Sequence, residues 1–471
     1  MKTLSLLKLG RRNIKSYGVH VITQRAVPDV RDALKVVHRR ILWTMFKDLK
    51  LQPKGPTQVA QKVMSATQGD YHPHSPEAVF DAIVTMSGTD NYPHPLVYGK
   101  GNWGSYNKPA GAPRYIGCKL SEVASKYMLD PDYLAVVDME NNYNGERKEP
   151  VYLPATLPFI LLNGGFGIAV GATSAHPPLH PETVDNYINQ WLKNGVVKPT
   201  VKNLRFNWYW GSECVAEEER IKQWLATGTG ALAFSANYDS DSHKRTVTFT
   251  DVPPFFNWKN ITKALRGDTR KKYDFVSGFN DLTDKNTADR KVKLQVKFKN
   301  SVNEDFDERV QDIVDLFTNS FSCNSNVTIR KTSEKVEFEK YNLATLVDVW
   351  MRYRVDLEVR AQDFIAKKIQ SDIDHQNLLK LAIDNIDLVI KTIRKSTEPK
   401  EDLVRKLSIT HEQAETIVAI PLGRISRISE TEIIKKKQNL VKERKAALSY
   451  RDNPNPKVQS DLKTGFEFIS K

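Results

Sequence analysis

The chain is most informative at residues 24–45, which read QRAVPDVRDALKVVHRRILWTM. Apolar side chains recur there every three or four residues, the spacing of one helix face; they are Ala33, Leu34, Val37, Ile41, Leu42 and Met45. Lys35, Arg39 and Arg40 are expected on the other side of this helix. A Pro- and Gly-rich loop at 52–56 and helical patterns over 59–65 and 78–86 follow. Short basic helices joined by turns predict a helix-turn-helix or winged-helix module.

Positive charge is concentrated at the start of the chain. The 471 residues carry a net charge of +14, and residues 1–62 hold fourteen Lys or Arg against three Asp. This asymmetry favours a polyanionic partner, although a solvated basic face is the simpler alternative. The sequence has no run of eighteen apolar residues, so no membrane span is expected. Three scattered cysteines fit a reducing compartment and no zinc site.

Strand patterns precede long helices in the rest of the chain. Residues 230–235 and 245–250 read as two strands around a polar loop at 239–242, and 291–298 alternates as a half-buried strand. After Asn342 the apolar spacing becomes that of a coiled coil, in Leu343, Leu346, Trp350, Tyr353, Leu357, Ala361 and Phe364. Further helices are expected over 378–393 and 431–448, the last returning antiparallel along the first. Residues 453–471 look like a loose tail.

An arginine and a tyrosine stand side by side at Arg114 and Tyr115. A tyrosine hydroxyl is almost fully protonated at neutral pH and is a weak nucleophile without help. A neighbouring guanidinium can steady the negative charge of a phosphate. Together with a basic surface, the pair suggests transesterification on a nucleic-acid backbone. The plainer alternative is two ordinary neighbours on a protein surface.

Five ordered segments resemble the A-type chain of bacterial type IIA topoisomerases, the gyrase A and topoisomerase IV A family. They are residues 24–40, 71–74 (YHPH), 99–105 (GKGNWGS), 114–115 (RY) and 162–171 (LNGGFGIAVG). Looser similarity runs through 251–254 and the later helices, so the resemblance covers about 25–450. The chain resembles a compact member of this family, of the kind that a bacteriophage would encode.

The resemblance implies roles for individual residues. Tyr115 would attack a DNA phosphodiester and become linked to the 5′ phosphate, and Arg114, Arg25 and His74 would act on that phosphate. For His74 the plainer alternative is a packed histidine in a turn. Ile168 would be a wedge between base pairs, where the alternative is a core residue of a Gly-flanked strand. DNA contacts are implied for Lys35, His38, Arg39, Arg40, His72, Lys100 and, as a turn or backbone contact, Asn163.

The resemblance also implies the fold and the partners. The fold class would be α+β multidomain, with an N-terminal arm (1–24), a winged-helix DNA-cleavage domain (25–155), an α/β tower domain (156–337), a long antiparallel coiled coil with a helical C-gate (338–452) and the tail (453–471). A homodimer would bind double-stranded DNA together with a B-type subunit, in a cytoplasmic A2B2 assembly. That partner would bind ATP and, in its TOPRIM domain, Mg²⁺, because this chain shows no P-loop and no suitable carboxylate cluster.

Departures from the family pattern keep alternatives open. Ser75, Pro76 and Glu77 stand where Gly, an acidic residue and Ser are usual, and Pro113 and Ile116 stand where Met and Thr are usual. A catalytically inactive DNA-bending or clamp homologue is one alternative, and a gyrase whose wrapping domain lies on another chain is a second. No C-terminal β-pinwheel is expected. Candidates for an exit-gate contact, or for the hydrophobic floor under it, are Ile417, Val418, Ile420 and Leu422.

Overall fold

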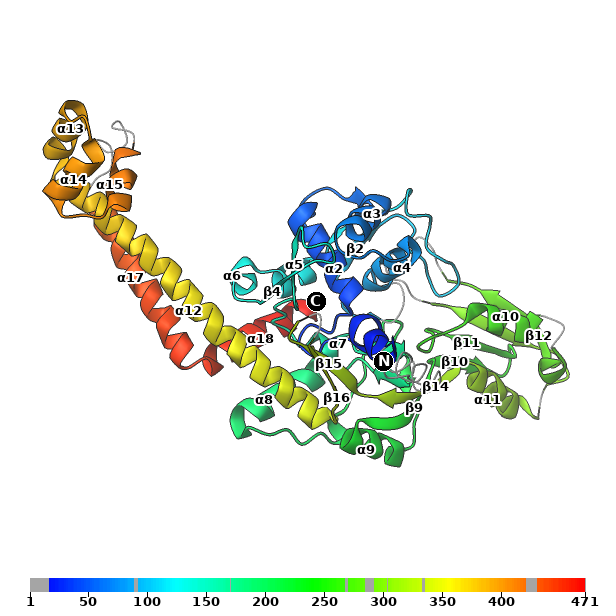
Figure 1. Cartoon of the computed structure of the whole chain (residues 1–471). Helices are drawn as coiled ribbons and strands as arrows, with labels where there is room; N and C mark the ends of the chain where they lie inside the picture. The colour runs from blue at the N-terminus through cyan, green and yellow to red at the C-terminus, as the bar shows by residue number, and fades with distance from the viewer. Residues whose placement is uncertain are drawn as a thin grey trace, which may run out of the picture. The chain divides into compact units, whose positions relative to one another are not determined.

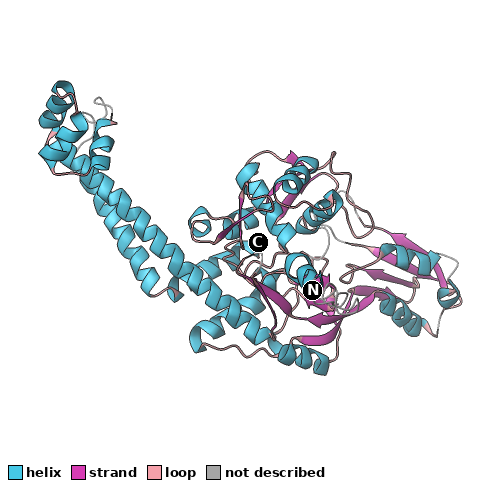
Figure 2. Cartoon of the chain, viewed as in Figure 1, coloured by secondary structure: helices cyan, strands magenta, loops and turns pink. Residues whose placement is uncertain are grey.

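The computed structural model describes residues 17–88, 92–169, 171–266, 270–283, 292–302, 304–332, 335–420 and 430–470. The chain forms two compact units, which are Met1–Arg354 with Gln459–Lys471 and Val355–Val458 (Figure 1). Helices and antiparallel sheets are both abundant (Figure 2), as an α+β class requires. Among the residues described, no helix is both long enough and apolar enough to cross a membrane.

The first helices of the first unit form because their apolar faces meet. They are η1 (Ile22–Ala26), α2 (Val36–Trp43), η2 (Thr44–Asp48), α3 (Ala60–Asp70) and α4 (Pro76–Met86), and α3 and α4 both pack against α2. Ile41, Leu42 and Met45 are completely buried, as their spacing predicts. Pro76 at the first position of α4 and Glu77 in its first turn are residues that helix starts favour.

A three-stranded antiparallel sheet lies beside these helices. Its order is β1 (Gln58–Val59), β3 (Gly117–Leu120) and β2 (Val97–Lys100). The chain then continues through α5 (Glu122–Met128), α6 (Pro131–Leu134), the hairpin of β4 (Met139–Asn141) and β5 (Lys148–Pro150), and α7 (Phe159–Leu162). The Ser121 hydroxyl caps α5 by accepting from the Ala124 N–H, which satisfies one free donor of that helix start.

A five-stranded sheet follows, in the order β6 (Gly165–Ala169), β7 (Ala172–His176), β14 (Thr318–Asn324), β9 (Thr229–Ser235) and β8 (Glu213–Cys214). The sequence expectation of a strand over 230–235 is confirmed in β9. The helix α9 (Glu218–Thr227) packs against β9, η3 (Val201–Asn203) contacts α9, and α8 (Pro181–Asn194) contacts α7. A separate hairpin joins β15 (Asn326–Arg330) to β16 (Val336–Lys340).

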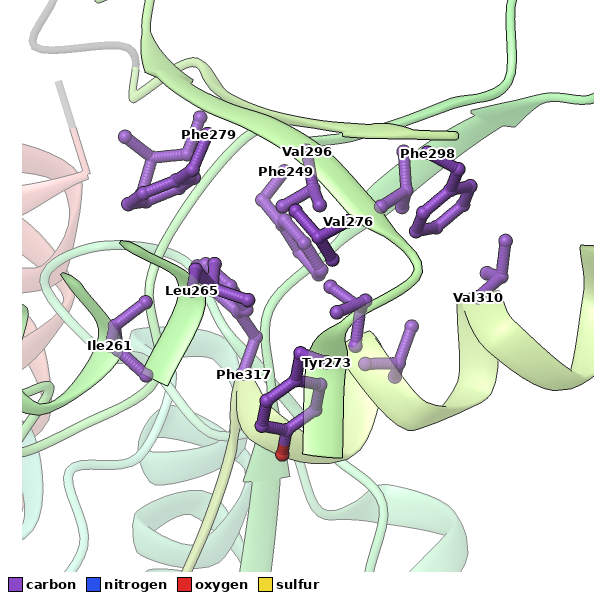
Figure 3. Close-up of a cluster of buried hydrophobic side chains, with 14 of the residues drawn as sticks. Phe249, Ile261, Leu265, Tyr273, Val276, Phe279, Val296, Phe298, Val310 and Phe317 are labelled. Carbon is purple, nitrogen blue, oxygen red and sulfur yellow. The ribbon is translucent and has the colours of Figure 1, made fainter. Parts of the chain in front are cut away.

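A four-stranded sheet has its own hydrophobic core (Figure 3). The order is β10 (Tyr238–Asp241), β11 (Thr246–Phe249), β13 (Leu294–Phe298) and β12 (Val276–Asp281), with α10 (Trp258–Arg266), η4 (Arg270–Tyr273) and α11 (Phe306–Leu316). The rings of Phe249 and Phe317 stack at 3.9 Å between centroids. The predicted alternation is confirmed in β13, although Lys291 lies outside the described residues. The expected polar loop at 239–242 is largely strand β10, because it pairs with β11.

The second unit is helical. α12 (Leu343–Asp384) begins in the first unit, and its later part runs antiparallel to α17 (Glu430–Asp452) (Figure 1). Lys380 pairs with Glu430 at 2.7 Å and Arg451 with Asp363 at 3.4 Å, so the predicted antiparallel return is confirmed. The unit also has α13 (Ile386–Lys395), α14 (Pro399–Leu407) and α15 (His411–Val418). Ile417 is buried in the core that these helices share, whereas Leu422 is outside the described residues.

Two expectations about the later helices are wrong. The helix expected over 378–393 is interrupted, because α12 ends at Asp384 and α13 begins at Ile386. Residues 453–471 are not a loose tail, because α18 (Asn455–Ile469) forms there. Val458, Leu462 and Phe466 recur every four residues along α18 and are buried. The prolines near its start suggested a loop rather than a helix, although proline is tolerated in a first helical turn.

Candidate functional site

Tyr115 is exposed in a turn that leads into β3. The turn spans 112–115, where the Tyr115 N–H donates to the Ala112 carbonyl at 2.9 Å and Pro113 holds the second position, which favours proline. The Pro113 carbonyl accepts from the Gln61 N–H, which ties the turn to the start of α3. The Tyr115 side chain is 74% exposed. The guanidinium carbon of Arg114 lies 4.7 Å from the centre of its ring.

The glycine-rich segment 99–104 supports this turn. A Cβ at Gly99 would come within 2.5 Å of the Trp103 indole, so the close packing requires glycine. The Trp103 Nε1–H lies 3.2 Å from the carbonyl oxygens of both Lys100 and Gly117, which joins β2 to β3. Lys100 is exposed and pairs in register with Gly117. The structure thus places Lys100 beside the strand that follows Tyr115.

A groove of about 640 Å³ gathers four residues that the sequence singled out, namely Arg25, Lys35, His38 and Ile168. Ile168 is 85% exposed near the tip of the β6–β7 hairpin, so it is no core residue. Within the described part of the chain, the Lys35 ammonium has no ion-pair partner, and burial lowers its pKa. An exposed apolar tip beside an unpaired cation suits a polyanion that also offers apolar surface.

His38 is a neutral member of this groove. It is 8% exposed, and burial, followed by the charges of Lys35 and Arg39, lowers the pKa of His38 to about 3. Its Nδ1 atom is buried without a hydrogen-bond partner among the described residues. A buried polar atom of this kind is unfavourable unless a ligand satisfies it.

Arg39 corrects the expectation that it faces away from the core. It is 4% exposed, and its Nε and Nη2 atoms donate to Asp32 at 2.7 and 3.1 Å. Asp32 also accepts from the backbone N–H groups of Leu34 and Leu153. α2 begins only at Val36, so Arg39 turns back toward the carboxylate that precedes the helix. In this conformation Arg39 joins α2 to the segment that precedes it and is not available to a phosphate.

The groove depends on a close approach between η1 and β6. A Cβ at Gly167 would lie 1.8 Å from the carbonyl oxygen of Ala26, so no other residue fits without backbone movement. Gly167 precedes Ile168, and Ala26 follows Arg25. The glycine therefore keeps Arg25 and Ile168, two of the exposed residues of the groove, on adjoining backbones.

His72, His74 and Arg40 form a second group. The two imidazole rings meet edge to face at 4.7 Å between centroids, and His74 is exposed. Arg40 Nη1 lies 3.2 Å from Nδ1 of His72, and Arg40 also donates to both oxygens of Glu149 at 2.6 Å. Burial, then the charges of Arg40, His74 and Arg25, lower the pKa of His72 to about 3. His72 is therefore neutral at pH 7.

Asn163 corrects another expectation, because its side chain does not face a ligand. It is 1% exposed. Its Oδ1 accepts from the His94 N–H at 2.8 Å, and its Nδ2 donates to the His94 carbonyl at 2.9 Å. Both ends of the amide are used within the protein, so Asn163 joins the end of α7 to the segment before β2. Asn163 was expected either to stabilise a turn or to contact the DNA backbone, and its bonds fit the first of these roles.

The tyrosine and the histidines lie at opposite ends of α3. The turn of Tyr115 is bonded to its first residues, whereas the His72 N–H donates to Thr67 in its last turn. Eleven residues of helix span about 16 Å. Within the described residues, no hydrogen bond or ion pair joins Tyr115 to His72, His74 or Arg25. One chain thus presents the predicted site residues in separate groups.

Glu149 was missed by sequence reasoning. It is 109 residues from Arg40 in the chain and belongs to no motif, so only the fold reveals their pairing. As for metals, no three His, Cys, Asp or Glu side chains gather to hold an ion in the described part of the structure.

Comparison with known proteins gives a consistent set of relatives. The family model for the A-type chain of DNA gyrase/topoisomerase IV matches residues 25–462. The A-type chain of DNA topoisomerase 4 from Caulobacter vibrioides is 29% identical over 450 residues, covering 94% of this chain and 58% of the relative. The A-type chain of DNA gyrase from Clostridium acetobutylicum is 27% identical, covering 90% and 51%. The A-type chain of DNA topoisomerase 4 from Neisseria gonorrhoeae is 28% identical, covering 98% and 63%. The chain therefore spans between half and two thirds of these relatives.

Proposed function

This chain belongs to the family of DNA gyrase/topoisomerase IV A-type chains, and we propose that it is the polypeptide that cuts and rejoins DNA in a type II topoisomerase. The observation that carries the proposal is the exposed phenol of Tyr115 beside the Arg114 guanidinium. A nucleophile for a DNA strand must be reachable by a rigid double helix. Tyr115 meets this condition because it lies in a surface turn.

The proposed reaction exchanges one phosphate ester for another. The Tyr115 oxygen attacks the phosphorus, the bond from phosphorus to the 3′ oxygen breaks, and a 5′-phosphotyrosine forms. The phenol loses one proton and the departing 3′ oxygen gains one, so the step consumes no co-reactant. Arg114 is close enough to the phenol to offset the charge that develops on the phosphate. Because the bonds broken and formed are similar, the strand can be resealed by the reverse step.

The groove of Arg25, Lys35, His38 and Ile168 is the proposed seat of the duplex. Lys35 brings a charge that has no ion-pair partner among the described residues, and Ile168 can enter a base step and bend the DNA. We propose that residues 25–155 act as a winged-helix cleavage domain and 156–337 as a tower. The helices over 338–452 would form a coiled coil that ends at a dimer contact.

Two copies of the chain are needed for a double-strand break, because each supplies one tyrosine. Tyr115 and the two histidines lie at opposite ends of α3, and this separation favours a site completed by the second copy. We propose an A2B2 assembly in the cytoplasm, acting on chromosomal or bacteriophage DNA. The B-type subunit would bind ATP and, in its TOPRIM domain, the Mg²⁺ that stabilises charge on the attacked phosphate. The described residues of this chain offer no cluster for that ion.

Covalent trapping tests the proposal. The chain is mixed with a B-type subunit, Mg²⁺ and supercoiled plasmid, with and without ATP, and then denatured to trap protein on DNA. Adducts and topoisomers are expected from the native chain, and neither from Tyr115→Phe. Tyr98→Phe is the matched control, because Tyr98 is also exposed but lies in β2. Adducts that persist in Tyr115→Phe would refute the assignment.

A catalytically inactive DNA clamp is the competing function. It predicts DNA binding and bending without any adduct, so the same assay separates the two. Ser75, Pro76 and Ile116 motivated this alternative, yet Ser75 and Pro76 form the start of α4 and Ile116 is buried in the core. The exposed phenol favours the enzyme.

A further inference from the structure

We propose that Glu149 and Arg40 are positioning residues that hold His72 as a neutral hydrogen-bond donor for the DNA phosphate. This inference rests on the proposed function, since it gives His72 a task in the cleavage step. It also reassigns Arg40, which the resemblance placed on a DNA phosphate.

The contacts of Arg40 leave it little capacity for DNA. A guanidinium has five N–H donors. Nε and Nη2 are directed at the two oxygens of Glu149 at 2.6 Å each, and Nη1 is directed at His72 at 3.2 Å. Glu149 is itself buried and compensates the charge of Arg40. One N–H remains on Nη1 and one on Nη2, but the Arg40 side chain is only 14% exposed and its charge is already balanced, so we expect it to add little to phosphate binding.

The same geometry fixes the tautomer of His72. An arginine can only donate, so the His72 Nδ1 atom must accept, and the single ring proton must sit on Nε2. The charges that face the ring come from Arg40 on α2, Arg25 on η1 and His74 in the same turn, and with burial they keep the ring neutral. A neutral imidazole with its proton on Nε2 can donate to a phosphate oxygen or to the departing 3′ oxygen.

Glu149 is held rigidly enough to serve this purpose. It lies in β5, directly across from Glu140 in β4. Glu140 binds Arg330 at 2.6 Å, and the carbonyl of Lys148 accepts from the Trp43 indole of α2 at 3.1 Å. The hairpin is therefore fixed to the protein on both sides of Glu149. Such support limits how far the carboxylate, and with it Arg40, can move.

A salt titration of DNA binding tests the reassignment of Arg40 without any partner protein. Each phosphate contact contributes about 0.9 to the slope of log affinity against log salt. The double variant Arg40→Gln with Glu149→Gln removes both charges together, which avoids leaving either one buried alone. Its slope on a short duplex should equal that of the native chain, whereas Lys35→Gln should lower the slope by about 0.9. A similar drop in the double variant would overturn the reassignment.

Cleavage kinetics test the role of Glu149. With Mg²⁺ and a B-type subunit, Glu149→Gln should slow formation of the Tyr115 adduct roughly ten- to hundredfold, because a misplaced donor is costly, while DNA affinity is unchanged. Glu146→Gln is the matched control, since it neutralises an exposed carboxylate in the loop of the same hairpin and should stay within a few-fold of the native rate. A native rate in Glu149→Gln would overturn the inference alone. Failure of the native chain to form any adduct would instead refute the proposed function.

Discussion

Gly167→Ala should separate the two segments that carry Arg25 and Ile168. The new Cβ would lie 1.8 Å from the carbonyl oxygen of Ala26, and protein contacts of this kind are not seen below 3.0 Å. The backbones of η1 and β6 must therefore part by about 1.2 Å. Both colliding groups belong to the fold itself, so no side-chain rotation can relieve the overlap. Overpacking costs about 1–3 kcal/mol, and we expect the upper end of that range.

Urea unfolding and fluorescence anisotropy with a labelled duplex measure the two effects. The variant should lose about 3 kcal/mol of unfolding free energy and bind DNA about tenfold more weakly, which corresponds to one contact worth about 1.4 kcal/mol. Gly69→Ala is the control, because an added Cβ there meets nothing within 4 Å. It lies in α3 and should gain up to about 1 kcal/mol with unchanged DNA affinity. A Gly167→Ala protein with native stability and native DNA affinity would show that the approach is not tight.

Three other changes have definite expected outcomes. Ile168→Ala should leave stability within about 0.5 kcal/mol, because the side chain is exposed, but should reduce DNA bending in an energy-transfer assay; an unchanged bend would exclude the wedge. Asp32→Asn strands the buried charge of Arg39 and should lower unfolding free energy by about 3–5 kcal/mol in denaturant titrations, and a loss below about 1 kcal/mol would contradict this. Burial lowers the pKa of His176 to about 4, below the value of about 6.5 of an unfolded histidine. The unfolded chain therefore binds the proton first, so stability is intact above about pH 6.5 and falls toward pH 4 by about 1.4 kcal/mol per pH unit for this residue. Replacing His176 with Gln should flatten a plot of unfolding free energy against pH by that amount, and an identical slope would be evidence against the assignment.

Local patterns in the sequence predicted the elements whose burial repeats regularly. Strict alternation identified β13, since its odd and even side chains meet different environments. Spacings of three and four identified the long helices, and salt bridges between α12 and α17 confirm their antiparallel course. The exposure of Tyr115 and Ile168 could be expected only from the resemblance, because an aromatic or branched apolar residue is usually buried.

Long-range pairing is where sequence reasoning failed. Whether Arg39 points inward depends on where α2 begins and on Asp32, which precedes it. The bond between Arg40 and Glu149 joins segments that only the finished fold brings together. Asn163 stands among glycines in a motif associated with DNA, yet its amide closes on the backbone of His94. Each of these side chains has a polar group whose hydrogen-bond partner cannot be predicted from helix or strand periodicity in the sequence.

In the proposed reaction, the openness of the turn at Tyr115 also affects how long the cut strand stays linked to the protein. A linkage formed on a side chain that stands mostly in solvent can be reached by water as well as by the broken end. Arg114 is the one neighbour whose charge touches its ring in the described structure, and it shelters little of it. Correct resealing would then require that the free 3′ end attacks the linkage before water does, so the end has to be held close to Tyr115. In the proposed reaction, a nucleic acid or a protein that docks over this surface would keep water away from the linkage until the strand is resealed.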